Sequence, residues 1–196
     1  MISNKAVFGL VAFAVALPAQ TISDADRKVA AEALRSSGAL FLRSIGGLSE
    51  AQWKFKAAPD RWSIAECAEH LAVTDPAMLA WIRTVLARPA GKAVAPSDQS
   101  VLAKSVDRSK KEKAPKSITP TGKLPTPAEV VATFRKNREE TIRYVETTQD
   151  ALRSHFTTSA TEPMDAFQWV LTIAGHTERH VAQINEVKAA AGYPGK

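Results

Sequence analysis

Apolar residues recur with helical spacing over four long segments of the chain. The segments cover residues 23–45, 63–88, 126–148 and 165–190. Two of them open with a capping box, in which a Ser or Thr is followed three residues later by Glu, at Ser63–Glu66 and Thr126–Glu129. No segment shows the sustained period-two alternation that is typical of a strand. The pattern therefore predicts an all-α fold, an up-down four-helix bundle with one long crossover connection.

Three features modify this simple picture. Residues 48–63 are expected to be a loop, and Pro76 predicts a kink or a short break near Asp75 in the second helix. The long connection, residues 89–125, is rich in proline and carries a basic run. An unstructured loop of that length is uncommon within a compact domain. We therefore expect either a mobile flap or a short helix over residues 98–111.

Two histidines lie four residues apart on the fourth segment, on the side that the helix buries. His180 falls on the apolar stripe with Ile173 and Ile184, and His176 lies at the edge of that stripe. Side chains at this spacing stand about 6 Å apart, which one metal ion can bridge. His70 lies on the flank of the apolar stripe of the second helix, and a bundle can bring that flank against the fourth helix. The residues alone leave two interpretations open, a three-imidazole metal site or a group of hydrogen-bonded core histidines.

The neighbouring residues offer no general base. Thr177 follows His176 where a zincin motif has Glu, and Glu178 points to the opposite side of the helix. Cys67 lies in the apolar stripe of the second helix and is interpreted as inert core. The fourth histidine, His155, lies in a polar loop and is expected to be exposed.

Length and charge restrict the function further. The 196 residues suffice for one well-buried domain, and the formal net charge is +6. Part of that charge lies within residues 104–116, where no aromatic residue is interleaved to stack on bases. We therefore interpret this run as a solvated loop and expect no nucleic-acid partner.

The first twenty residues have the layout of a secretory signal peptide. Lys5 precedes an apolar run, Ala6–Leu17, which is followed by a small residue, Ala19. The run is too short to span a bilayer, although an uncleaved anchor and a buried first helix remain alternatives. The predicted organisation is a signal peptide over residues 1–19 and a four-helix domain over 20–196. The protein is expected to be exported, periplasmic or secreted, with no stable membrane insertion after processing.

Two segments resemble the DinB-like family, the superfamily of four-helix-bundle metalloproteins that includes YfiT-type metal-dependent hydrolases. One is PDRWSIAECAEHLAVTD, residues 59–75, and the other is GHTERHVAQINEVKAAAGYP, residues 175–194. The resemblance spans about residues 23–194. It implies that His70, His176 and His180 bind one divalent metal ion.

The resemblance implies a reaction class but no substrate. We expect hydrolysis of a small molecule by metal-activated water, with Zn²⁺, Ni²⁺ or Fe²⁺ as the metal because imidazole suits all three. The alternatives are a non-catalytic metal-binding or interaction bundle and a thiol-dependent transferase. Export disfavours the transferase because an oxidising compartment is poor in reduced thiols. A homodimer is compatible with a bundle of this size.

Overall fold

The computed structural model describes residues 21–111, 113–157 and 162–195. The predicted signal peptide, residues 1–19, lies outside the described residues. The helices are α1 (Asp24–Ile45), α2 (Glu50–Lys54), α3 (Ile64–Leu86), α4 (Asp98–Val106), α5 (Pro127–Thr147) and α6 (Ala166–Lys188), with 3-10 turns η1 (Lys116–Ile118) and η2 (Leu152–Ser154). The described residues contain no strand, only an isolated bridge between Phe156 and Asp165. The predicted all-α fold is confirmed.

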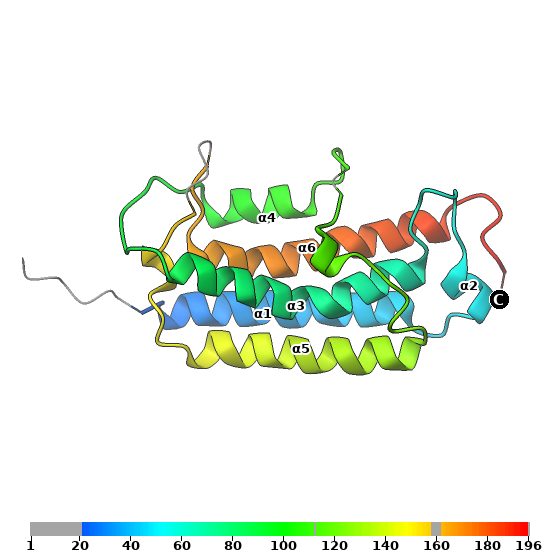
Figure 1. The fold of residues 1–196 in the computed structure, drawn as a ribbon, viewed down its shortest axis with the longest axis horizontal. Coiled ribbons are helices and arrows are strands. Elements are labelled where there is room, and N and C mark those ends of the chain that lie inside the picture. Colours follow the sequence, from blue (N-terminus) through cyan, green and yellow to red (C-terminus); the bar gives the residue numbers. More distant parts are fainter. Residues whose placement is uncertain (1–20, 112, 158–161, 196) are drawn as a thin grey trace, which may run out of the picture.

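Four long helices, α1, α3, α5 and α6, form the bundle (Figure 1). Both α1 and α3 pack against α5 and α6, so α1 and α3 occupy opposite corners of the bundle. The helix starts predicted from the sequence agree with the structure, because a capping box begins each of the four helices. The N-cap residues are Ser23, Ser63, Thr126 and Asp165.

The long connection between α3 and α5, residues 89–125, is the crossover, and it sets the directions of the helices. It returns the chain from the end of α3 to the end of the bundle where α3 began, so α5 runs parallel to α3 (Figure 1). The helices α1 and α6 run the opposite way. Accordingly, Arg27 at the start of α1 donates hydrogen bonds to the carbonyls of Val145 and Thr148 at the end of α5. The bundle therefore runs up, down, down, up, with the single long crossover that the sequence predicts.

The predicted break near Asp75 does not occur, because α3 continues through Pro76. A proline has no N–H to donate to the carbonyl four residues earlier. That carbonyl, on Ala72, instead accepts a hydrogen bond of 2.8 Å from the side-chain amide of Asn137 on α5. A neighbouring helix thus satisfies the polar group that the proline frees.

The segment 48–63, expected to be a loop, contains the short helix α2. Ser49 and Gln52 form a capping box at its start, and Trp53 lies buried in the core with 2% of its surface exposed. The capping pattern is visible in the sequence. The helix is too short for a periodicity argument to detect it.

Two apolar clusters fill the bundle, one towards each end, and a polar layer lies between them. The centre of this layer is Arg138 on α5, which forms a buried ion pair with Asp75 on α3. The remaining guanidinium N–H groups donate to the Leu34 carbonyl and to the hydroxyls of Ser37 and Thr177. Every helix of the bundle is therefore tied to one arginine at its middle.

The crossover contains α4, which packs along α6 on the outside of the bundle (Figure 1). The predicted short helix over residues 98–111 is confirmed in position, but it ends at Val106. Gly175 allows the close approach, since a Cβ atom at this position would lie 2.6 Å from the Cβ of Ser105. No helix in the described ranges is long and apolar enough to cross a membrane.

Candidate metal site

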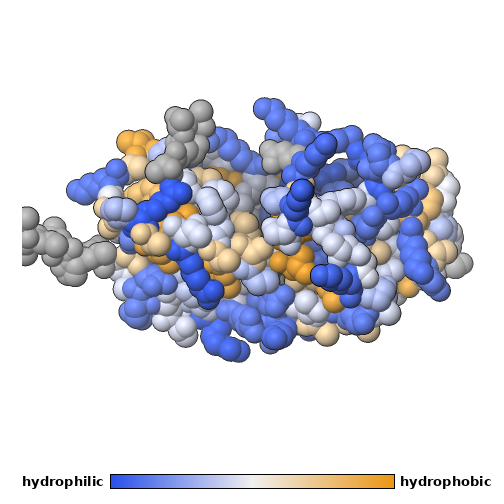
Figure 2. Space-filling model, in the orientation of Figure 1, coloured by the Kyte–Doolittle hydropathy of each residue, from blue (hydrophilic) through white to orange (hydrophobic). Residues whose placement is uncertain are grey.

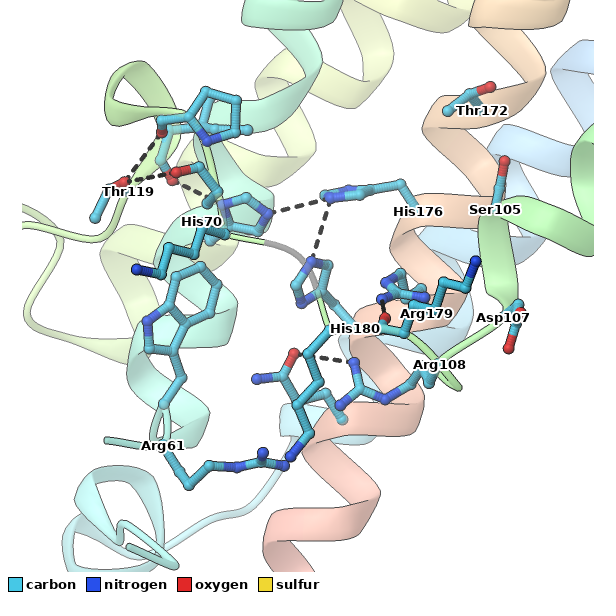
Figure 3. A pocket seen from close by; sticks show the side chains of 18 of the residues that line it. Arg61, His70, Ser105, Asp107, Arg108, Thr119, Thr172, His176, Arg179 and His180 are labelled. Carbon is cyan, nitrogen blue, oxygen red and sulfur yellow. Dashed lines mark hydrogen bonds between the residues drawn. The ribbon is translucent and has the colours of Figure 1, made fainter. Parts of the chain in front are cut away.

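The rings of His70, His176 and His180 meet at the interface between α3 and α6 (Figure 3). Nε2 of His176 lies 3.2 Å from Nε2 of His70 and 3.2 Å from Nε2 of His180. One nitrogen of each ring lies within 4.8 Å of the other two. The flank of α3 therefore faces α6, as the bundle arrangement of the sequence analysis requires, and the three histidines form one cluster.

The crossover fixes the orientation of His70. Nδ1 of His70 donates a hydrogen bond of 2.7 Å to the backbone carbonyl of Ile118 in η1. A carbonyl only accepts, so the proton resides on Nδ1 and Nε2 presents its lone pair towards the other two rings. This outer hydrogen bond is the arrangement that commonly orients a metal-binding histidine.

Glu69, the residue before His70, holds the next part of the crossover. Its carboxylate accepts hydrogen bonds from the backbone N–H groups of Thr121, Gly122 and Lys123 and from the Thr121 hydroxyl. Gly122 has a φ of 77°, which a residue with a side chain rarely adopts. The adjacent pair Glu69 and His70 thus anchors residues 118–123 on α3. The role of Glu69 is not visible in the sequence because its partners lie more than 50 residues away in the chain.

Burial keeps the three imidazoles neutral. It lowers the pKa of His70, and with the neighbouring charges it lowers the pKa of His176 to about 3 and that of His180 to about 2. Neutral imidazole is the form that binds a metal ion. The cluster therefore has its coordinating form at physiological pH.

The indole of Trp62 covers one side of the cluster. Its ring stacks on His180 at a centroid distance of 6.0 Å and lies 5.1 Å from the ring of His70. Nδ1 of His176 and Nδ1 of His180 are buried and have no hydrogen-bond partner among the described residues. Packing, rather than an outer hydrogen bond, therefore orients these two rings.

The cluster lies in the wall of a cavity of about 1020 Å³ that the crossover partly covers. Among its described lining residues, seven are Lys or Arg and two are Asp. Most of the positive charge comes from residues 104–113, part of the basic run that was expected from the sequence to be a solvated loop. The run is indeed exposed, and the surface over this part of the molecule is largely hydrophilic (Figure 2). It also forms part of the rim of the candidate site.

The other candidates from the sequence lie outside the cluster. Cys67 is fully buried, and burial raises the pKa of its thiol to about 12, which confirms inert core. Glu178 is exposed on the far side of α6. His155 was expected to be exposed, and this is wrong. Its ring is half-buried and donates from Nδ1 to the Arg88 carbonyl at 2.8 Å, because the chain after η2 lies beside the segment that follows α3, where the Gly91 N–H also donates to the Ser154 carbonyl.

The donor set fits a divalent metal ion. A tetrahedral ion about 2.05 Å from each imidazole nitrogen separates those nitrogens by about 3.3 Å, close to two of the distances found here. Three neutral donors leave at least one coordination position free, and the cavity gives access to it. These properties define a helical bundle with a three-histidine cluster that is suited to a divalent metal ion.

Comparison with known proteins identifies the family. A family model described as the DinB superfamily matches residues 33–184, and the chain belongs to this superfamily. YfiT from Bacillus subtilis has a similar solved structure, with a TM-score of 0.58 and 15% sequence identity, covering 91% of this chain and 95% of that one. It is described as a probable metal-dependent hydrolase with an unusual four-helix bundle topology. No curated protein matches this chain.

Proposed function

We propose that the protein binds one divalent metal ion through His70, His176 and His180 and hydrolyses a small substrate in the adjoining cavity. The observation that carries this proposal is the convergence of three neutral imidazoles in the wall of an accessible cavity, with Nε2 of His176 3.2 Å from Nε2 of each of the other two rings. The description of YfiT as a probable metal-dependent hydrolase supports the same reaction class.

A metal ion at this position supplies Lewis acidity, which lowers the pKa of water towards about 7 and polarises a carbonyl or phosphoryl group. The residues of the chain would bind the metal ion, orient its ligands and limit the access of solvent. The Ile118 carbonyl holds His70 in the required tautomer, and Trp62 limits the approach of solvent from its side of the cluster. The donor set accepts Zn²⁺, Ni²⁺ and Fe²⁺ alike.

The open cavity is the specific observation that favours an enzyme over a structural metal site. A structural zinc site is closed by four protein ligands, whereas a catalytic site keeps a position for water or substrate. In the described residues, three histidines and no further Cys, Asp or Glu make up the candidate donor group.

A screen of hydrolysable compounds tests the proposal. Tag-free protein loaded in turn with Zn²⁺, Ni²⁺ and Fe²⁺ is assayed against ester, amide and phosphoester panels, with and without an added thiol. We expect a turnover that the metal-free protein lacks, that His176→Ala abolishes and that the control His155→Ala retains. Full activity of His176→Ala on such a substrate contradicts the mechanism, and metal binding without any turnover favours the non-catalytic alternative.

A further inference from the structure

The cations at the rim of the cavity are only partly paired with acidic residues. Arg108 is committed to Glu186, with two hydrogen bonds of 2.7 and 2.8 Å, and Lys104 pairs with Glu162. By contrast, the ammonium groups of Lys110 and Lys111 take part in none of the ion pairs found among the described residues, although Lys110 interacts electrostatically with Asp107 and Lys111 with Glu186. Ion pairs therefore balance part of the positive charge at this cavity, and Lys110 and Lys111 add positive charge that the nearby Asp107 and Glu186 balance only in part.

Arg179 connects Lys110 and Lys111 to the histidine cluster. It lies on α6 directly before His180, and its guanidinium donates a hydrogen bond of 2.6 Å to the backbone carbonyl of Lys110 (Figure 3). The bond holds the segment of the crossover that carries Lys110 and Lys111 against α6. The guanidinium keeps further N–H groups, and Arg179 lines the same cavity as His176 and His180.

Apolar side chains lie in another part of the wall. Trp62 and Ile118 line the cavity beside His70, and the volume of about 1020 Å³ suits a small organic molecule. The cavity therefore has three different regions: a cluster of neutral imidazoles, an apolar face and a cationic rim.

From this arrangement we propose that the substrate is a small organic anion, whose carboxylate or phosphate group is bound by Lys110, Lys111 and Arg179 while its reacting bond lies at the histidine cluster. The carbon skeleton then lies along Trp62. The assignment rests on the proposed function for the reaction, but the anion-binding rim consists of side chains outside the metal site. Because charged groups at an open rim attract an anion over several ångströms, binding weakens with ionic strength.

Calorimetric titration at low ionic strength tests the proposal. The probes are succinate, inorganic phosphate and the neutral isostere succinamide, each added to the tag-free, metal-loaded protein. We expect succinate or phosphate to bind about tenfold or more tightly than succinamide, and the stronger of the two identifies the preferred anionic group. Failure of both anions to bind, or equal binding of succinate and succinamide, overturns the proposal.

A charge-reversal variant locates the binding. Lys110→Glu/Lys111→Glu should weaken anion binding about tenfold with unchanged metal content, whereas Lys28→Glu/Lys136→Glu makes the same change in net charge on exposed positions of α1 and α5 and should have little effect. Equal effects of the two double variants overturn the proposal.

The metal content, the charge-reversal variant and the His176→Ala variant together separate this proposal from the proposed function. If the wild-type protein holds no metal but its anion binding depends on Lys110 and Lys111, the proposed function fails and the anion site stands. If anion binding survives the charge reversal but disappears in His176→Ala, the anion binds to the metal alone and the inference made here fails.

Discussion

The backbone carbonyl of Ile118 accepts a hydrogen bond from Nδ1 of His70 at 2.7 Å, which makes the crossover a component of the histidine cluster. The contact joins residues that lie 48 positions apart. It persists only while the crossover stays on α3, and Glu69 supplies the anchor through the N–H groups of residues 121–123. Glu69 is therefore a positioning residue for the site.

The anchor predicts a pH-dependent stability. Burial opposes ionisation of Glu69, but the hydrogen bonds from Gly122, Thr121 and Lys123 together lower its pKa below the ordinary 4.5. A carboxyl group whose pKa is lowered by folding stabilises the protein above its unfolded pKa and loses this contribution as the pH falls through the folded pKa. Glu69→Gln should lower the free energy of unfolding by about 1–3 kcal/mol at neutral pH, with a difference that shrinks below pH 4.5.

Urea unfolding at several pH values measures this effect, with the exposed Glu139→Gln as the control. A difference between wild type and Glu69→Gln that stays constant down to strongly acidic pH contradicts the role of the carboxylate. We also expect Glu69→Gln to weaken metal binding by about tenfold through His70, which a purely structural role of Glu69 would not produce.

Gly175 sets how closely α4 approaches α6. In Gly175→Ala the new methyl group meets the Cβ of Ser105 at 2.6 Å, so α4 has to shift. We expect a loss of about 1–3 kcal/mol in stability, although Ala is the better helix former by about 1 kcal/mol. The second substitution Ser105→Gly removes the contact and should restore most of the loss. A Gly175→Ala variant that is more stable than wild type would contradict the close packing of α4 against α6.

The buried ion pair of Arg138 and Asp75 predicts a different response. Arg138→Leu leaves a buried carboxylate without its cation and should cost about 3–5 kcal/mol. Removing the carboxylate as well, in Arg138→Leu/Asp75→Leu, should recover a large part of that loss. Thermal and urea unfolding check the pair against Arg135→Leu, an exposed position on the same helix where little change is expected. A double variant no more stable than the single one would show that the ion pair is not the dominant contact of Arg138.

Cys67 should be unreactive in the folded protein. Its side chain is fully buried and its pKa is raised to about 12, so neither access nor thiolate is available at neutral pH. A thiol-specific chromogenic reagent should label the protein only after unfolding in urea. Rapid labelling of the native protein would mean that the start of α3 opens readily.

The local signals in the sequence predict the helices. They predict only in part which residues of different helices contact one another. The starts of α1, α3, α5 and α6 follow from cap residues that act on their own backbone, such as Ser63 with Glu66. The same logic identifies α2 through Ser49 and Gln52, but so short a helix has no periodicity. The continuity of α3 at Pro76 depends on Asn137, a residue on another helix, and no local pattern contains that information.

The same difference between local and distant contacts applies to the candidate site. His176 and His180 are one turn apart on one helix, so their proximity follows from the helix geometry alone. Their meeting with His70 depends on which flank of α3 faces α6, and the resemblance to the DinB-like family indicated this. The contributions of Ile118, Glu69 and Arg179 could not be predicted, since each involves a backbone group of the crossover, whose position follows from tertiary packing.

The central claim is that His70, His176 and His180 together bind one divalent metal ion. The most direct measurement is the metal content of tag-free protein, by mass spectrometry of the element after exchange into metal-depleted buffer. The account predicts one equivalent per chain in the wild type and in His155→Ala, and a large loss in each of His70→Ala, His176→Ala and His180→Ala. Wild-type protein that is folded but takes up no metal, or a His155→Ala variant that loses as much metal as His176→Ala, would contradict it.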